Sequence, residues 1–163
     1  MADVEQTLSA LAGDIGALLK ERGDTIAIAE SSSGGLISAA LLSVPGASAY
    51  FLGGGVIYTR DARRNLLMLP EDQVTMRAST TEYAAIVAQK IQSQLGATWG
   101  LGESGATGPT GNRYGDAAGH VAIAITGPTP MTDVLETGSD DREANMWRFA
   151  DASLALLKKA LAG

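Results

Sequence analysis

A short apolar run that ends in a Ser/Gly turn and resumes as a helix limits most strongly what this chain can fold into. Residues 25–29, Thr-Ile-Ala-Ile-Ala, have the length and unbroken apolar character of a buried strand. Residues 30–35, Glu-Ser-Ser-Ser-Gly-Gly, follow, and apolar residues then recur at helical spacing from position 36. A strand that is buried on both faces and leads into a helix is typical of layered α/β folds.

The rest of the chain alternates between helical and strand-like patterns. Helices are predicted over about residues 5–21, over 61–67, from 79 or 80 to 95, and from 140 or 141 to the end. Further strands are predicted at 56–59, 99–102, 119–125 and 132–137, and the Gly127-Pro128 turn allows a hairpin between the last two. We therefore predict a single α/β/α layered domain over residues 1–163, with a mixed, mostly parallel sheet flanked by helices.

Composition excludes several classes of function. The chain has 0 Cys and a single histidine, His120, so thiolate chemistry and multi-histidine metal sites are excluded, and we predict neither a metal nor a cofactor. The net charge is −6 with no basic stripe, which argues against nucleic acid as a partner. The sequence shows no signal peptide and no membrane-spanning stretch, so we expect a cytoplasmic protein without a membrane partner. Its apolar helices favour a homo-oligomer.

The turn at residues 30–35 is the first candidate binding site. Loops between a buried strand and a helix are where open α/β sheets usually bind ligands, because backbone N–H groups and the positive end of the helix meet there. Ser31, Ser32 and Ser33 offer hydroxyls, and Gly34 and Gly35 allow a close approach to the backbone. The turn could hold an anion or an oxyanion. In the alternative interpretation a serine is the helix N-cap and the glycines serve packing.

Several segments, taken in order, resemble the family of the CinA C-terminal domain. Residues 29–35, Ala-Glu-Ser-Ser-Ser-Gly-Gly, are similar to its Ala-Glu-Ser-x-Thr-Gly-Gly signature. Residues 45–51 and 55–59 look like its next segment and its Gly-x-Val-x-Tyr-Ser strand. Residues 104–109 and 119–124 resemble its Ser-Gly-x-Ala-Gly-Pro loop and the Gly-x-Val strand that follows. The resemblance runs from about residue 5 to the C-terminus, and the chain looks like the stand-alone form, without the N-terminal domain of full CinA proteins.

The resemblance implies an amidase that converts nicotinamide mononucleotide to nicotinic acid mononucleotide and ammonia. The family nucleophile falls on Ser31 and the tyrosine near the site falls on Tyr58. The small molecule bound would be a mononucleotide. A serine hydroxyl needs a base to remove its proton before it attacks an amide, and backbone N–H groups of the turn would stabilise the oxyanion that forms.

One departure from the family pattern affects this chemistry. The family lysine that is thought to serve as the base is replaced by Arg63, and arginine keeps its proton at ordinary pH. Three explanations stay open. In the first, the reaction proceeds slowly with Arg63 present, and Tyr58 or a water takes the proton. In the second, another residue such as His120 is the base. In the third, the chain is a catalytically impaired nucleotide-binding or regulatory relative.

A second candidate site is the Gly-rich loop at residues 105–111, whose backbone could form a nest around a phosphate. An ordinary surface turn is the alternative. The residues expected to bind substrate here, together with those at the first turn, are Glu30, Ser32, Ser33, Gly34, Gly35, Gly105, Thr107, Gly108, Asn112 and Arg142. Glu103 ends a predicted strand near the site, where it could order a neighbouring donor. The segment 112–116 could close over a ligand or pack on a partner subunit.

Overall fold

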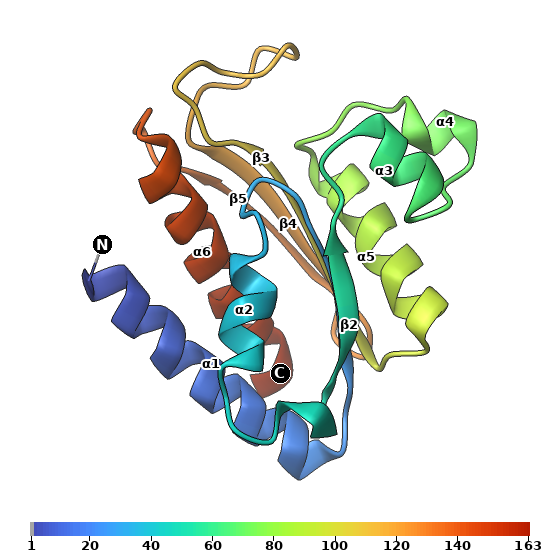
Figure 1. Ribbon diagram of the computed structural model, residues 1–163, viewed down its shortest axis with the longest axis vertical. Coiled ribbons are helices and arrows are strands. Elements are labelled where there is room, and N and C mark those ends of the chain that lie inside the picture. Colours follow the sequence, from blue (N-terminus) through green and yellow to red (C-terminus); the bar gives the residue numbers. More distant parts are fainter. Residues whose placement is uncertain (1) are drawn as a thin grey trace.

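The chain folds into one five-stranded sheet with helices on both faces (Figure 1). The computed structural model describes the backbone of residues 2–163 and the side chains from Leu8 onward. The helices are α1 (Ala2–Arg22), α2 (Leu36–Leu42), the 3₁₀ helix η1 (Ala47–Ala49), α3 (Arg60–Asn65), α4 (Glu71–Val74), α5 (Thr81–Leu95) and α6 (Arg142–Ala162). The strands are β1 (Ile26–Glu30), β2 (Phe51–Val56), β3 (Trp99–Ala106), β4 (His120–Thr126) and β5 (Met131–Glu136).

The sheet is mixed, as predicted. Its strand order is β2-β1-β3-β4-β5, in which β1 pairs in parallel with both β2 and β3. β4 is antiparallel to β3 and to β5, so it alone runs against the other strands. The predicted hairpin between β4 and β5 is present, and its register pairs Ile125 with Met131. The C-terminal ends of β1, β2 and β3 therefore lie at one edge of the sheet.

Alternating side chains on β1 supply two hydrophobic cores. Ile26 and Ile28 belong to the core that also contains residues of α1, α2 and α6, whereas Ala27 and Ala29 belong to the core that contains residues of α5. All of β1 is buried, which explains why its sequence reads as an unbroken apolar run. In Figure 1, α1, α2 and α6 cover one face and α3, α4 and α5 cover the other.

The helix boundaries follow local capping chemistry. The side chains of Thr59, Thr80 and Asp141 accept hydrogen bonds from backbone N–H groups in the first turns of α3, α5 and α6. Gly96 ends α5 in a left-handed conformation, as predicted. The prediction placed Asp61 at the start of α3, but Thr59 is the cap. Pro70 then begins the short helix α4, which the sequence pattern did not predict.

The prediction for the second strand was displaced along the chain. We predicted a strand at 56–59 preceded by glycines, but β2 consists of Phe51–Val56 and contains those glycines. Gly54 packs against β1 so closely that a Cβ there would lie 2.2 Å from the Ile28 carbonyl oxygen. The glycines are thus strand residues beside another backbone. As a consequence Tyr58 lies beyond the strand, at the edge of the sheet.

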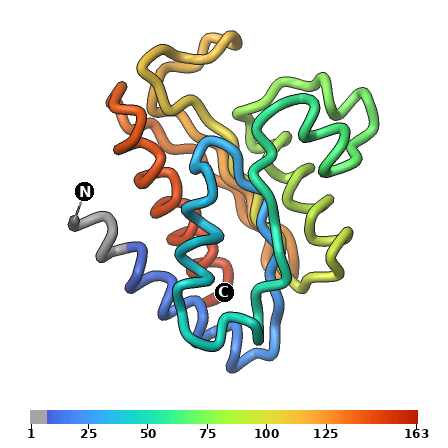
Figure 2. Tube along the Cα trace, in the orientation of Figure 1, coloured from blue at the N-terminus to red at the C-terminus, as the bar shows by residue number. Residues whose placement is uncertain are grey.

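Four segments gather at this edge of the sheet. Figure 2 shows the turn after β1, the segment that follows β2, the long loop between β3 and β4 and the start of α6 at the same end of the molecule. These segments contain both candidate binding loops. None of the helices in the described part of the chain is long and apolar enough to cross a membrane.

Candidate functional site

Glu30, the last residue of β1, organises the turn that follows it. Its buried carboxylate accepts hydrogen bonds from the backbone N–H groups of Gly35, Ile37 and Ser38 at 2.8, 3.1 and 2.9 Å. The Ser38 hydroxyl donates to the same carboxylate at 2.7 Å. A carboxylate at the first turn of α2 satisfies N–H groups that the helix itself leaves unpaired. Glu30, predicted to bind substrate, instead holds α2 in place.

A second buried carboxylate reaches the same turn from β3. Glu103 Oε2 accepts hydrogen bonds from the backbone N–H groups of Ser31 and Ser33 at 2.8 and 3.1 Å and from the Ser33 hydroxyl at 2.7 Å. Its other oxygen contacts the Ser32 hydroxyl. Burial raises the pKa of Glu103, against the effect of these hydrogen bonds. Glu103 therefore joins β3 to the whole serine turn.

These two carboxylates change the predicted role of the turn. Between residues 31 and 38, the N–H of Ser32 is the only backbone donor that has no partner within the described residues. The prediction that the turn from Ser32 to Gly35 forms an oxyanion hole is therefore wrong for every donor but this one. Gly34 and Gly35 have φ values of 67° and 103°, so they are required by the shape of the turn. Neither lines a cavity at this edge of the sheet.

Ser31 faces a cavity of about 320 Å³. Its hydroxyl has no hydrogen-bond partner among the described residues. The residues that line the cavity come from the turn after β1, the segment after β2 with α3, the segment before α5, the end of β3 and the loop that follows β3. They are Ser31, Tyr58, Arg63, Ala78, Ser79, Ser104, Gly105, Asn112, Arg113 and Tyr114. The structure thus brings together the three residues predicted to be catalytic, Ser31, Tyr58 and Arg63.

An adjoining cavity of about 220 Å³ lies under the Gly-rich loop. It shares Tyr58, Gly105 and Asn112 with the Ser31 cavity. Its other lining residues are Ser32, Ala106, Thr107, Gly108, Thr110, Gly111 and Arg142. Most of the residues predicted to bind substrate therefore surround one two-part cleft.

Arg142 and Tyr58 form one wall of this cleft. The Arg142 guanidinium donates to the Gly108 carbonyl oxygen at 2.6 Å and to the Tyr58 hydroxyl at 3.1 Å. Tyr58 remains 58% exposed, so its ring is open to a ligand. The start of α6 is thereby connected to the Gly-rich loop and to the segment after β2, and one cation is fixed beside the smaller cavity.

Arg63 lines the larger cavity of the cleft, which Arg142 does not line, and its environment is different. Its side chain is buried, and its guanidinium donates to the carbonyl oxygens of Val74 and Met76 at 2.8 and 3.2 Å. The guanidinium carbon lies 4.4 Å from the centre of the Tyr83 ring, an attractive cation–π contact. Its Nε has no hydrogen-bond partner in the described part of the chain. A buried cation of this kind holds charge and does not accept a proton.

The predicted polar contacts in the Gly-rich loop serve mainly to shape the loop. The Asn112 side-chain oxygen accepts hydrogen bonds from the N–H groups of Tyr114 and Asp116, and its amide nitrogen donates to the Asp116 carboxylate. Asn112 thus closes a local turn, an alternative that the sequence pattern did not separate from ligand binding. Thr107 is buried, and its carbonyl oxygen accepts from Asn145 at 2.9 Å.

His120, considered as a base for Ser31, is placed elsewhere. It does not line either cavity of the cleft, and its Nε2 lies 2.8 Å from the Ser79 carbonyl oxygen while its Nδ1 contacts the Glu136 carboxylate. Both partners are acceptors, and this arrangement favours a ring that is protonated on both nitrogens. Burial lowers the pKa of His120, but these partners outweigh it and the net shift is upward. The structure therefore argues against His120 as the base.

The charge lining the cleft is opposite to that of the whole chain. Of the charged residues that the structure describes, only Arg63, Arg113 and Arg142 line it, although the chain as a whole has a net charge of −6. Such a cleft favours an anionic ligand.

Ser79 and Ser104 line the cleft, but the sequence analysis missed them. The N–H of Ser79 donates to the Ser104 hydroxyl at 3.1 Å, and no motif joins residues so far apart in sequence.

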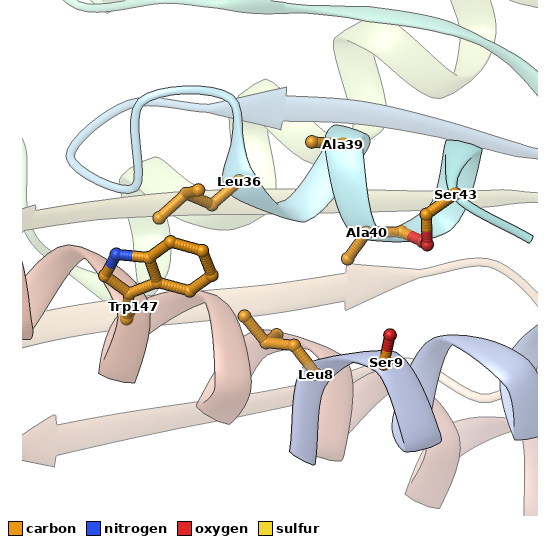
Figure 3. Close-up of a pocket in the computed structure, with 7 residues that line it drawn as sticks. All are labelled: Leu8, Ser9, Leu36, Ala39, Ala40, Ser43 and Trp147. Carbon is orange, nitrogen blue, oxygen red and sulfur yellow. The ribbon is translucent and has the colours of Figure 1, made fainter. Parts of the chain in front are cut away.

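A third cavity is separate from this cleft. It encloses about 170 Å³ between α1, α2 and α6, and its lining residues include Leu8, Leu36 and Trp147 (Figure 3). The lining is largely apolar and includes none of the residues predicted to form the site. It does not contribute to the chemistry at Ser31.

Taken together, the fold and the cleft define an α/β protein with an arginine-lined cleft at the C-terminal ends of parallel strands. Residues 8–161 match the CinA C-terminal domain family. The chain therefore belongs to this family, which confirms the resemblance noted from its motifs.

Curated relatives and solved structures agree with this assignment. A CinA-like protein of Synechococcus elongatus is 33% identical over 96% of this chain and 40% of its own length. One from Desulfosudis oleivorans is 36% identical over 93% and 37%. The chain thus spans about two fifths of the length of these curated relatives.

Two solved structures share the fold over nearly their whole length. A competence-damaged protein (CinA) superfamily protein from Klebsiella pneumoniae superposes with a TM-score of 0.87 at 27% identity, covering 95% of this chain and 98% of that one. The competence/damage inducible protein CihA from Agrobacterium tumefaciens also gives a TM-score of 0.87 at 27% identity, covering 96% of each chain.

Proposed function

We propose that this chain hydrolyses the amide of nicotinamide mononucleotide to nicotinic acid mononucleotide and ammonia. The observation that carries the proposal is the position of Ser31, whose free hydroxyl faces a cavity together with Tyr58 and Arg63. The adjoining cavity, with Arg142 at its mouth and the Gly-rich loop around it, suits the phosphate of the ligand. The arginine lining and the family membership support the same assignment.

In this mechanism the Ser31 oxygen bonds to the amide carbon and the carbonyl oxygen becomes an oxyanion. The unpaired N–H of Ser32 and the positive charge of Arg63 are the groups available to stabilise it. The hydroxyl of Tyr58, or a water beside it, accepts the serine proton while it passes its own proton to the leaving nitrogen, which departs as ammonia. Water attacks the resulting ester and releases the acid and Ser31.

The Ser31→Ala variant tests this assignment. We expect ammonia release from nicotinamide mononucleotide to fall by at least about 10³-fold, because the nucleophile is lost. Ser93→Ala, the same substitution at an exposed position on α5, is the matched control and should keep full activity. Equal activity of the Ser31→Ala variant and the wild-type protein would show that Ser31 is not the nucleophile.

A second candidate function is binding of the nucleotide without turnover. The buried Arg63 at the position of the family lysine favours it, since the described cleft then lacks a neutral base. Measuring ammonia release and binding of nicotinamide mononucleotide on the same purified sample separates the two functions. Binding without ammonia release selects the second.

Arg63→Lys tests whether the missing lysine limits the chemistry. A lysine in this cavity can lose its proton and act as a base, so we expect ammonia release to rise by at least about tenfold, within the range that general base catalysis provides. Initial rates of ammonia release from the variant and the wild-type protein measure this. An unchanged or lower rate, with binding retained, would show that the missing lysine is not the limiting defect.

A further inference from the structure

Arg63 is a buried cation without a counter-ion among the residues that the structure describes. Arg63 is only 6% exposed, yet none of the ion pairs found among the described residues includes it. The neighbouring Arg64 shows the contrast, because it is exposed to solvent and pairs with Glu71 at 2.8 Å and Asp61 at 3.3 Å. Burying a charge is costly unless the charge is paired, so a buried arginine beside a cavity needs an explanation.

The contacts of Arg63 within the chain leave part of its binding capacity unused. One terminal nitrogen holds two carbonyl oxygens, the Tyr83 ring lies against the guanidinium, and the buried Nε is without a hydrogen-bond partner. Guanidinium groups bind carboxylates through two parallel N–H donors. Ser31 lines the cavity beside Arg63, so the reacting carbonyl of a substrate would lie in this cavity. None of the described residues that line it is acidic.

We propose that Arg63 forms a carboxylate subsite, so that the cleft binds the nicotinic acid form of the nucleotide in preference to the nicotinamide form. This inference rests on the proposed function for the kind of ligand. The carbonyl that Ser31 attacks becomes the carboxylate of the product, at the end of the cleft where Arg63 lies. The other end, with Arg142 and the Gly-rich loop, is left for the phosphate.

The charges of the two ligands also favour binding of the acid form beside Arg63. The nicotinamide ring of the nucleotide is a pyridinium cation, and a fixed guanidinium in the same cavity opposes it. In the acid form a carboxylate lies between the two cations and pairs with the guanidinium. Arg63 therefore makes nicotinic acid mononucleotide, the product, a tighter ligand than nicotinamide mononucleotide. The product is also released more slowly than it would be from a site with an uncharged residue at position 63.

The experiment compares four ligands by calorimetric titration: nicotinic acid mononucleotide, nicotinamide mononucleotide, and the two corresponding ribosides, which lack the phosphate. We expect the wild-type protein to bind each acid form at least about tenfold more tightly than its amide, because charge-assisted hydrogen bonds contribute that much. Arg63→Gln and Arg63→Met should lose this preference, and Arg64→Gln, on the same helix, should keep it. Circular dichroism of each variant confirms that it is folded.

Several results would overturn the subsite. These are equal or weaker binding of the acid forms by the wild-type protein, a preference that persists in a folded Arg63 variant, and no binding of any of the four ligands. A loss of affinity in the Arg63 variants that is equal for acid and amide and disappears with the ribosides would assign Arg63 to the phosphate instead. Ammonia release is measured separately on the wild-type protein, so the proposed function can fail or stand independently of this preference.

Discussion

At the scale of single residues, three buried charged groups determine the chemistry of the cleft, and each is compensated differently. Glu30 is satisfied by the N-terminus of α2. Glu103 is satisfied by the serine turn, with the help of a raised pKa. Arg63 is held by carbonyl oxygens and an aromatic ring, which do not neutralise it. In our proposal, the carboxylate of the ligand neutralises Arg63.

Glu103 provides a prediction about stability. A glutamine side-chain oxygen can accept the hydrogen bonds from the Ser31 and Ser33 N–H groups, and its amide nitrogen can donate to the Ser32 oxygen. We therefore expect Glu103→Gln to cost less than about 1 kcal/mol at pH 7, whereas Glu103→Ala leaves buried donors unpaired and costs about 2–3 kcal/mol. Urea unfolding measures both, with the exposed Glu82→Gln as control. A glutamine variant as unstable as the alanine variant would contradict this account.

At the scale of elements, the close packing of α5 on β3 depends on two glycines. A Cβ at Gly100 would lie 2.4 Å from the Ala88 carbonyl oxygen, and one at Gly102 would lie 2.1 Å from that of Ala84. The strand thus presents bare backbone to the helix and large side chains, Trp99 and Leu101, to the other core. This packing places Ser104 and the segment before α5 at the Ser31 cavity.

Two alanine substitutions at glycines should have opposite effects. Gly102→Ala forces α5 away from the sheet, and we expect it to reduce the free energy of unfolding by about 3 kcal/mol. Gly13→Ala, within α1 and with nothing within 4 Å of its Cβ, should increase it by about 0.5–1 kcal/mol, because alanine favours the helix. Thermal and urea unfolding of both variants provide the measurement. A neutral Gly102→Ala would contradict the close packing.

At the scale of the whole molecule, His120 connects segments that are distant in the chain. It begins β4, contacts Glu136 on β5, and donates to the Ser79 carbonyl oxygen just before α5. Asp116, in the loop that covers the cleft, lies 3.9 Å from it. The protonation of one imidazole ring therefore affects the sheet, the start of α5 and the loop over the cleft together.

This arrangement predicts how stability depends on pH. Because the pKa of His120 is raised in the folded state, its contribution is fully present below the unfolded value of 6.5 and is lost as the pH rises through the folded value. The difference in free energy of unfolding between the wild-type protein and His120→Gln should therefore shrink as the pH rises above 6.5. Urea unfolding at several pH values tests this, and a difference that is constant with pH would show that the ring is not charged.

The homo-oligomer predicted from the apolar helices stays a prediction.

The amino-acid sequence by itself determined the order of the main elements, the buried strand with its serine turn, the hairpin and the family. These depend on local periodicity, on capping residues and on motifs that are contiguous in the chain. It also brought attention to Ser31, Tyr58 and Arg63, because each follows a recognisable segment. The family signature indicated where the nucleophile falls, but it did not indicate which backbone donors remain unpaired around it.

Only the tertiary structure decided how the charges at the site are used. Glu103 accepts a hydrogen bond from Ser31, which lies 72 residues away in the chain. Both ring nitrogens of His120 contact other groups, the Ser79 carbonyl oxygen and the Glu136 carboxylate. Whether a carboxylate binds a ligand or a helix end, and whether a buried arginine has a counter-ion, depends on neighbours that adjacent strands bring together. Burial and pairing are properties of the packed chain, and local sequence does not encode them.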